Sequence, residues 1–264
     1  MLDQEISEDW EPEVQAQWRS NQSNVRMEIL AEHGMIGGED KIANYRALGV
    51  APWSIVYEHN EALSQVRSAF AHGDFYPALV GACALGERIF NHLILDLRCD
   101  YADHPKTTKR ARSKNTFTDW GAAIDVLHGW GVLNDEVREG YLALEVFRHD
   151  SVHYSSVTDV VNRERALDAI RMIQQIVQSI FAPMGGPPTF IPGTSGASFI
   201  SLAAEATPLI RRVFLPRSAL VSPNHGMRPV RAPRGELRWQ VVDETDYDDN
   251  VLTDAEFAAA LAYV

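Results

Sequence analysis

The segment between residues 75 and 97 constrains the fold more than any other part of the chain. Its apolar residues recur at intervals of three and four, which is the spacing of one face of an α-helix. These residues are Ala78, Leu79, Ala82, Leu85, Ile89, Leu93 and Leu97. Asp74 precedes the segment and can cap a helix there. A helix this long and this apolar must pack against other helices, so we expect it at the centre of a helical bundle.

Similar helical spacing dominates the chain up to about residue 182. Glycine, proline or a capping side chain separates the predicted helices, and most connections are short, which favours antiparallel neighbours. Three other helices are predicted at residues 11–32, 39–48 and 54–72. A fourth is capped by Thr116 or Thr118 and runs to Trp130, a fifth starts at Asn134, and a sixth is capped by Asn162. We therefore predict a mainly α fold, an antiparallel helical bundle.

The pattern changes after residue 182. Residues 184–196 are rich in proline and glycine, which indicates a linker. Beyond it, residues 209–215 and 237–242 resemble strands, and Thr253 can cap a closing helix. We therefore predict a small C-terminal α+β appendage. The expected parts are an N-terminal helical extension (1–52), the bundle (53–183), the linker (184–196) and the α+β domain (197–264).

The composition is typical of a soluble protein with a sizeable core. The 264 residues are 45% hydrophobic and 23% charged, and no uninterrupted apolar run reaches the roughly 20 residues that a membrane-spanning helix needs. The N-terminus has neither the basic nor the apolar segment of a signal peptide. Two cysteines, Cys83 and Cys99, are too few for a disulfide framework. We expect a cytoplasmic protein without a membrane partner.

The formal net charge of −12 argues at first sight against a nucleic-acid partner, because phosphate attraction needs positive charge. However, the acidic excess lies in residues 1–13 and 236–256, and residues 14–235 are close to neutral. One basic run without acids lies in this middle part, and it is either a solvated loop between helices or a phosphate-contacting loop. Its candidate RNA-binding residues are Lys106, Lys109, Arg110, Arg112 and Lys114.

The segment 147–154 concentrates the chemistry of the chain, because Arg148 and His153 lie there at the end of a predicted helix. Arginine is a permanent cation whose planar guanidinium matches phosphate oxygens. Histidine can donate or accept a proton near neutral pH. The two side chains together suit the cleavage of a phosphodiester without a metal ion or another cofactor.

The apolar helix at 76–97, the helix at 120–132 and the motif helix that follows resemble a HEPN domain (higher eukaryotes and prokaryotes nucleotide-binding) over residues 55–182. The HEPN signature is an arginine, four to six residues and then a histidine, often with a polar residue directly after the arginine. Here it is matched by Arg148, His149 and His153. The resemblance implies an all-helical ribonuclease that needs no metal, works as a homodimer on RNA, and belongs to a toxin–antitoxin or antiviral defence system, with an antitoxin or regulatory protein as a further partner.

Helix geometry gives a physical reason for the dimer that the resemblance implies. Five residues turn an ideal helix by about 500°, so Arg148 and His153 point about 140° apart. A helix end that unwinds, or a second subunit, would bring both groups to one phosphate. In the mechanism that the resemblance implies, His153 is the general acid or base for the ribose 2′-hydroxyl, and Arg148 stabilises the charged phosphorane. Asp150 precedes His153 by three residues and could orient its imidazole.

Three other interpretations stay open. Arg148 could simply pair with Glu145 or with an acid elsewhere on the bundle, while His153 caps the helix C-terminus. His149 and His153 share a helix face and could bind zinc, but no third ligand has recognisable spacing, so we predict no metal and no cofactor. Finally, a HEPN-like bundle without catalysis could serve as a dimerisation or partner-binding module.

Overall fold

A computed structural model describes residues 5–152, 163–181, 201–217, 225–231, 237–243 and 253–261. The chain divides into two compact units, Met1–Ala182 and Pro183–Val264. The described residues are mainly helical, which confirms the predicted fold class at that level. The linker predicted at 184–196 lies outside the described residues.

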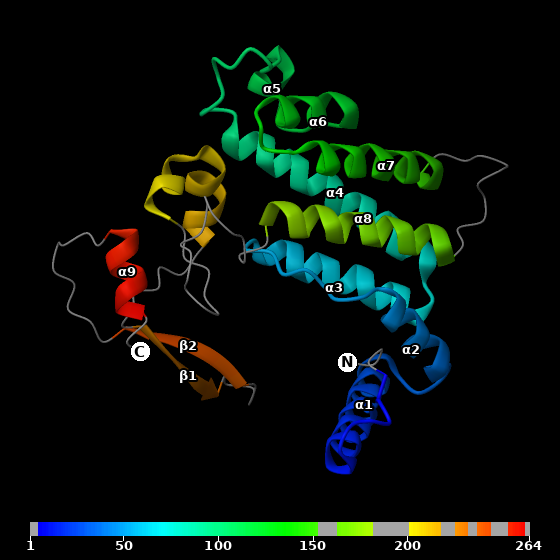
Figure 1. Cartoon of the computed structure of the whole chain (residues 1–264). Coiled ribbons are helices and arrows are strands. Elements are labelled where there is room, and N and C mark those ends of the chain that lie inside the picture. The colour runs from blue at the N-terminus through cyan, green and yellow to red at the C-terminus, as the bar shows by residue number, and fades with distance from the viewer. Residues whose placement is uncertain are drawn as a thin grey trace. The chain divides into compact units, whose positions relative to one another are not determined.

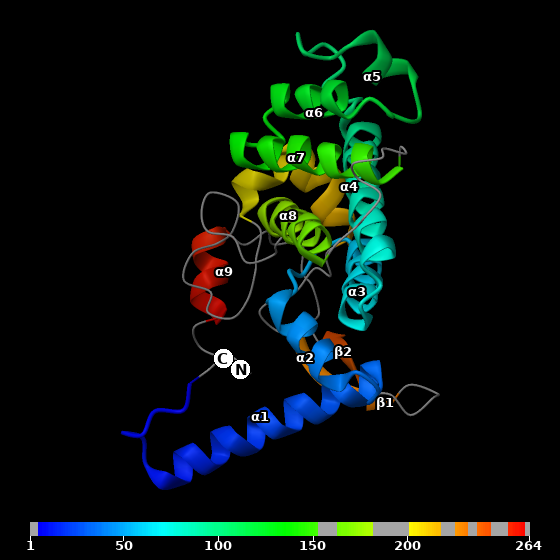
Figure 2. The same cartoon turned by 90° about the vertical axis from the view of Figure 1, so that its right-hand side faces the viewer.

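The first unit is built from eight described helices, which Figure 1 shows coloured from blue to yellow-green. Helix α1 packs against α2, and α2 packs against α3, as the turned view in Figure 2 also shows. Helix α3 in turn packs against α4 and α8. The helices are α1 Pro12–His33, α2 Gly38–Ala47, α3 Tyr57–His72, α4 Phe75–Leu97, α5 Lys109–Ser113, α6 Trp120–Gly129, α7 Asp135–Val152 and α8 Arg163–Phe181.

Helix α4 is the centre of the first unit, as its apolar pattern predicted. It packs against α3, α6, α7 and α8, and the whole predicted apolar stripe is buried. Asp74 stands at its N-cap position, although its side chain makes no capping hydrogen bond. Gly86 allows the closest approach, because a Cβ atom there would lie 2.7 Å from Leu144 of α7 and 3.4 Å from Trp120 of α6. Both neighbouring helices therefore reach α4 at one level, where the candidate site begins.

Among the described residues, α4 is also the one helix whose length and apolar composition would allow it to cross a membrane. Within its most apolar window, 56% of the residues are buried inside the folded chain. The contacts of α4 with four other helices account for this composition, because the core helix of a bundle must be apolar on most sides.

The helix ends follow ordinary capping chemistry, with one correction to the prediction. Asp119 caps α6, and the predicted caps Thr116 and Thr118 do not. The Asp119 Oδ1 accepts a hydrogen bond from the backbone N–H of Ala122 at 3.1 Å, and aspartate is as good a cap as threonine or better. Asn134, the predicted start of the motif helix, caps α7 by accepting a hydrogen bond from the backbone N–H of Val137. The predicted cap of α8 lies outside the described residues.

The described residues of the second unit form a β-hairpin, helix α9 and three short helical segments. Strands β1 His225–Arg231 and β2 Leu237–Asp243 pair antiparallel, and β2 coincides with the strand predicted at 237–242. Helix α9, Asp254–Leu261, begins directly after the predicted cap Thr253, whose Oγ1 accepts a hydrogen bond from the helix. The short helical segments are Leu202–Ala206, Ile210–Phe214 and Leu215–Arg217.

The strand predicted at 209–215 is wrong. This stretch is helical, and Ile210, Val213 and Phe214 are its buried residues. Their spacing of three and then one places all three on one helix face. A strand would have turned Val213 and Phe214 to opposite faces, so the burial pattern explains why the helical conformation wins here.

Candidate functional site

Helix α7 carries the Arg148 side chain toward α4. Val137, Tyr141 and Leu144 are buried at intervals of three and four, on the face of α7 that meets the bundle. Arg148 follows Leu144 by four residues, so it continues the same face one turn further. Its side chain is 29% exposed, which leaves part of the guanidinium accessible to a ligand.

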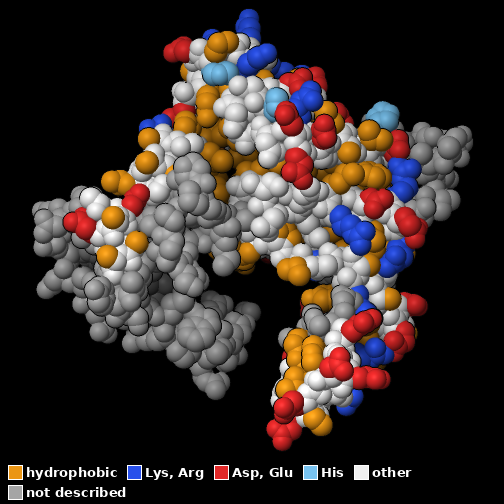
Figure 3. Space-filling model, viewed as in Figure 1, with side chains coloured by type: hydrophobic (Ala, Val, Ile, Leu, Met, Phe, Trp, Pro, Cys, Tyr) orange, Lys and Arg blue, Asp and Glu red, His pale blue; other side chains and the backbone are white. Residues whose placement is uncertain are grey.

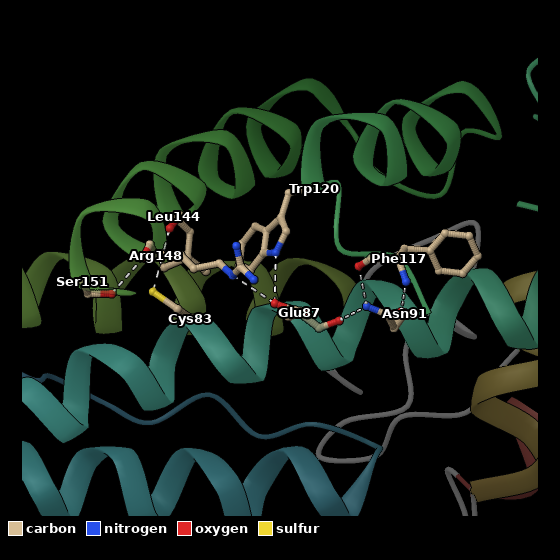
Figure 4. Close-up of polar contacts among 8 residues, drawn as sticks. All are labelled: Cys83, Glu87, Asn91, Phe117, Trp120, Leu144, Arg148 and Ser151. Carbon is tan, nitrogen blue, oxygen red and sulfur yellow. Dashed lines mark hydrogen bonds and ion pairs between the residues drawn. The ribbon is translucent and has the colours of Figure 1, made fainter. Parts of the chain in front are cut away.

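Arg148 meets a carboxylate and an indole there, as Figure 4 shows. Its Nε lies 3.1 Å from Oε2 of Glu87, and its guanidinium carbon lies 5.8 Å from the centre of the Trp120 ring. The Trp120 indole N–H donates to the same Glu87 oxygen at 3.2 Å. We call these three residues the Arg148 cluster. The two terminal nitrogens of Arg148 make no hydrogen bond to a described residue, so they are the donors that a ligand would meet.

Three polar residues on α4, spaced one turn apart, hold α6 and α7 around this cluster. Asn91 bonds the backbone of Phe117 in both directions, donating to its carbonyl at 3.2 Å and accepting from its N–H at 2.8 Å. Glu87 lies one turn before Asn91 on α4. One turn earlier, the Cys83 thiol donates to the carbonyl of Leu144 at 3.9 Å (Figure 4). We call Cys83, Glu87 and Asn91 the α4 polar row.

The Cys83 thiol is an unreactive member of this row. Burial raises its pKa to about 12, even though the nearby positive charge of Arg148 acts to lower it. The thiolate is the nucleophilic form of cysteine, and almost none of it exists at neutral pH when the pKa is so high. Cys83 therefore contributes packing and one weak hydrogen bond, and the chemistry of the site must come from the other residues.

The remaining motif residues lie around the end of α7. The Asp150 carboxylate pairs with Arg165 of α8 at 2.6 Å, and the Arg165 guanidinium lies 5.6 Å from the Phe147 ring. Asp150 thus joins α7 to α8. The sequence had predicted a different role for it, that of orienting the imidazole of His153. His149 is exposed on α7. His153 lies outside the described residues.

The basic run lies in the exposed connection between α4 and α6, which contains the short helix α5; we call this connection the basic loop, and buried residues hold it from inside. The buried Thr107 Oγ1 donates to the carbonyl of Tyr101 at 2.5 Å and accepts from the Trp130 indole at 2.8 Å. The rings of Tyr101 and Trp130 stack with their centres 4.8 Å apart. Figure 3 shows Lys and Arg side chains, mixed with acids and histidine, at the end of the bundle that α5 occupies in Figure 1. The exposed candidate residues are Lys106, Lys109, Arg110, Arg112 and Lys114.

The basic loop connects to the Arg148 cluster through the start of α6. Arg110 lies 3.7 Å from the Asp119 carboxylate and 3.5 Å from the Thr118 hydroxyl. Asp119 is the cap of α6, and the next residue is Trp120 of the cluster. The structure therefore links the loop and the motif helix at the start of α6, although they lie far apart in the sequence.

Sequence reasoning missed Glu87 and Trp120 as neighbours of Arg148. One alternative paired Arg148 with Glu145 or with an acid elsewhere on the bundle, without naming it, and the acid is Glu87 of α4. One signal was present in the sequence, because Glu87 is an acid next to a buried glycine within a strongly apolar helix. A charge in such a position needs a partner, since burial without one is unfavourable.

No group of three or more His, Cys, Asp or Glu side chains in the described part of the chain is placed to hold a metal ion. Of the two histidines considered for zinc, only His149 belongs to that part. No protein-family model matches the chain, and neither does any curated protein or any solved structure. The assignment to a function therefore rests on the residue pattern and on the geometry around Arg148.

Proposed function

We propose that the chain is a metal-independent endoribonuclease of the HEPN type, a cytoplasmic toxin or defence effector that an antitoxin or regulatory protein restrains. The ribose 2′-oxygen attacks the adjacent phosphorus, and the bond from phosphorus to the 5′-oxygen breaks. His153 takes the proton from the 2′-hydroxyl or returns one to the 5′-oxygen. The products carry a 2′,3′-cyclic phosphate and a 5′-hydroxyl. In this proposal, residues 53–183 are the HEPN-like bundle and residues 197–264 are a small α+β domain.

The observation that carries the proposal is the way in which the Arg148 guanidinium is held. Glu87 holds it through Nε, and Trp120 lies along its face. The terminal nitrogens stay available to a phosphate, and two parallel N–H donors match two phosphate oxygens. A cation fixed in advance stabilises the charge of the phosphorane without reorganising during the reaction. Arg148 can therefore bind phosphate without first releasing Glu87.

The basic loop supports the same proposal. The Thr107 hydrogen bonds and the stacked Tyr101 and Trp130 rings fix its backbone, while its five cationic side chains face solvent. A loop that is already ordered loses little entropy when it binds the RNA backbone. Arg110 lies next to the helix end that carries Trp120, so RNA bound along the loop would lead toward Arg148.

The proposal includes a homodimer, because Arg148 and His153 would point about 140° apart on a continuous helix. In a dimer, His153 of one subunit would act on a phosphate bound by Arg148 of the other. Light scattering at micromolar concentration should give twice the chain mass of 29.5 kDa. A strict monomer that still cleaves RNA would contradict this two-subunit site.

A second candidate function is a non-catalytic HEPN-like module that dimerises or binds a partner protein. The observation that favours it is that Arg148 and Asp150 both make ion pairs within the chain, with Glu87 and Arg165. Both pairs join α7 to a neighbouring helix, which is what purely structural pairs would do. This module would bind its partner without cleaving RNA.

Cleavage of single-stranded RNA in EDTA separates the two candidates. The wild-type protein should leave 2′,3′-cyclic phosphate ends, and His153→Ala should lose on the order of 10²–10⁴-fold in rate. His128→Ala is the matched control, since His128 is an exposed histidine whose Nε2 lies 2.8 Å from Asp135 at the far end of α7. Full activity of His153→Ala, or dependence of cleavage on added zinc, would overturn the proposal. Absence of cleavage with retained dimerisation would favour the non-catalytic module.

A further inference from the structure

A cleft of about 600 Å³ lies between α1, α2 and α3. Its volume is within the range of roughly 300–1,000 Å³ that small-molecule sites occupy. His33 of α1, Tyr45 of α2, Trp53 before α3 and Arg67 of α3 contribute to its walls. None of the residues of the Arg148 cluster or the basic loop lines it, so it is a separate candidate site.

Arg67 is a buried cation on the wall of this cleft, with a side chain that pairs with no carboxylate of the described residues. The residue is 8% exposed. Its Nη2 donates to the carbonyl of Gly49 at 2.8 Å, and its Nη1 donates to Gln174 Oε1 and to the carbonyl of Leu48 at 3.4 Å. Burial lowers the pKa of Arg67, but a guanidinium still stays charged at neutral pH. Because its acceptors are neutral, the wall keeps a positive charge.

His33 is a second buried polar group on the wall. It is 4% exposed, and neither ring nitrogen has a hydrogen-bond partner among the described residues. The nearest carboxylate, that of Glu32, lies 4.0 Å from Nε2, which is beyond hydrogen-bond distance. Burial lowers the pKa of His33, so the imidazole is neutral at pH 7 and offers one donor and one acceptor. Both ring nitrogens are closed off from solvent, so a ligand in the cleft would meet the ring of His33 and not its nitrogens.

The aromatic residues of the cleft favour a planar ligand. Trp53 lies on the rim and is 54% exposed, although large aromatic side chains are normally buried. Tyr45 lies deeper, with its ring centre 5.8 Å from the Arg67 guanidinium carbon. The cleft is lined by two cations, Arg46 and Arg67, and one acid, Glu32, so the net charge of its walls is about +1. The walls therefore suit a planar ring that carries one negative charge.

We propose that this cleft binds a small aromatic carboxylate. The carboxylate lies toward Arg67, and the ring stacks against Trp53. A nucleoside phosphate carries up to two negative charges against this net charge of about +1, so the carboxylate class fits better. Binding at this cleft does not depend on the proposed RNA cleavage.

Fluorine NMR on the full chain with 4-fluorophenylacetate tests the proposal. We expect saturable binding with a dissociation constant below about 1 mM, and at least tenfold weaker binding of the neutral 4-fluorophenylacetamide. Adenosine monophosphate serves as the competing probe. The proposal is wrong if the acid and the amide bind equally well, or if the acid shows no saturable binding. It is also wrong if adenosine monophosphate displaces the acid at a lower concentration than unlabelled phenylacetate does.

Two substitutions place the binding in the cleft. Ser64 lines the cleft from an exposed position on α3, so Ser64→Tyr should fill the cleft, leave the fold intact and weaken binding at least tenfold. Gln65→Tyr is the matched control, because Gln65 is the next exposed residue of α3 and does not line the cleft. Trp53→Ala should weaken binding severalfold. Unchanged binding in both Ser64→Tyr and Trp53→Ala would show that the cleft is not the site.

Discussion

Two arginines of the first unit illustrate opposite ways of holding a positive charge. Arg148 is partly exposed and has a carboxylate partner, Glu87, at 3.1 Å. Arg67 is buried and has only neutral acceptors, among them the carbonyl of Gly49. The exposed arginine is thus neutralised within the chain, whereas the buried one is not.

This difference teaches what each arginine contributes. The side chains of Arg148 and Glu87 are each about 30% exposed, so water screens their pair only in part, and the pair fixes the orientation of the guanidinium. Arg67 satisfies carbonyls at the end of α2 and bonds Gln174 of α8, so the fold depends on it. We therefore expect loss of Arg67 to affect stability first, and loss of Arg148 to affect function first.

The largest expected effect is on stability. Arg67→Ala leaves the buried Gln174 Oε1 without the Arg67 donor, takes a donor from the Gly49 carbonyl and removes a buried side chain, so it should lower the free energy of unfolding by about 3 kcal/mol. Urea unfolding followed by circular dichroism measures this change. The matched control is Arg171→Ala, because Arg171 bonds the carbonyl of Ala47 at 2.9 Å from an exposed position. The free energy of unfolding of the control should fall by less than about 1 kcal/mol. Equal falls in both variants would contradict the conclusion that the fold depends on Arg67.

The second effect is on cleavage. Lysine at position 148 keeps the charge but has no planar fork, so Arg148→Lys should stay folded and bind RNA, yet cleave it about 10²-fold more slowly. Thermal unfolding and a cleavage assay on the same sample check both parts. Arg138→Lys is the control, since Arg138 is also on α7, has a side chain 35% exposed and makes an ion pair with Asp125 of α6. A large fall in the melting temperature, or wild-type cleavage, would make Arg148 a structural residue.

A smaller effect is expected on RNA affinity. Glu87→Gln keeps an acceptor for the Trp120 indole but removes the negative charge beside Arg148. The phosphate should then meet less repulsion, and the RNA dissociation constant should fall about threefold. Binding measured in low salt and in 0.15 M salt tests the electrostatic origin, because the gain should shrink as salt screens it. Weaker RNA binding would mean that Glu87 is needed to orient the guanidinium.

The smallest effect concerns pH and stability near Arg67. Burial lowers the pKa of His33 in the folded chain, so below about pH 6.5 the unfolded chain binds a proton that the folded chain does not yet bind. The stability that His33 contributes is present above that pH and is lost as the pH falls through its lowered folded pKa. The melting temperature of the wild type should therefore fall more between pH 7.5 and 5 than that of His33→Phe. Parallel losses in both proteins would show that other groups dominate.

The sequence predicted the elements of the fold better than their contacts. The apolar stripe of α4 was readable because burial follows the helical period along one segment. The helix at Ile210–Phe214 was mistaken for a strand because a short apolar run does not distinguish the two. The pairing of Arg148 with Glu87 could not be predicted from the sequence, since it depends on the packing of α7 on α4. The Arg67 cleft was missed for the same reason, because three helices form it.

The α4 polar row also fixes how far α4 can slide along its own axis. Cys83, Glu87 and Asn91 stand one turn apart, and each holds a different point on α6 or α7 or the loop before α6. A slide of one turn, about 5.4 Å, would bring a thiol opposite the Trp120 indole in one direction, or a carboxylate opposite the Leu144 carbonyl in the other. Both new pairings are unfavourable, so the row fixes the axial position of α4 relative to α6 and α7. The residue that orients Arg148 is thus also one that keeps the central helix in place.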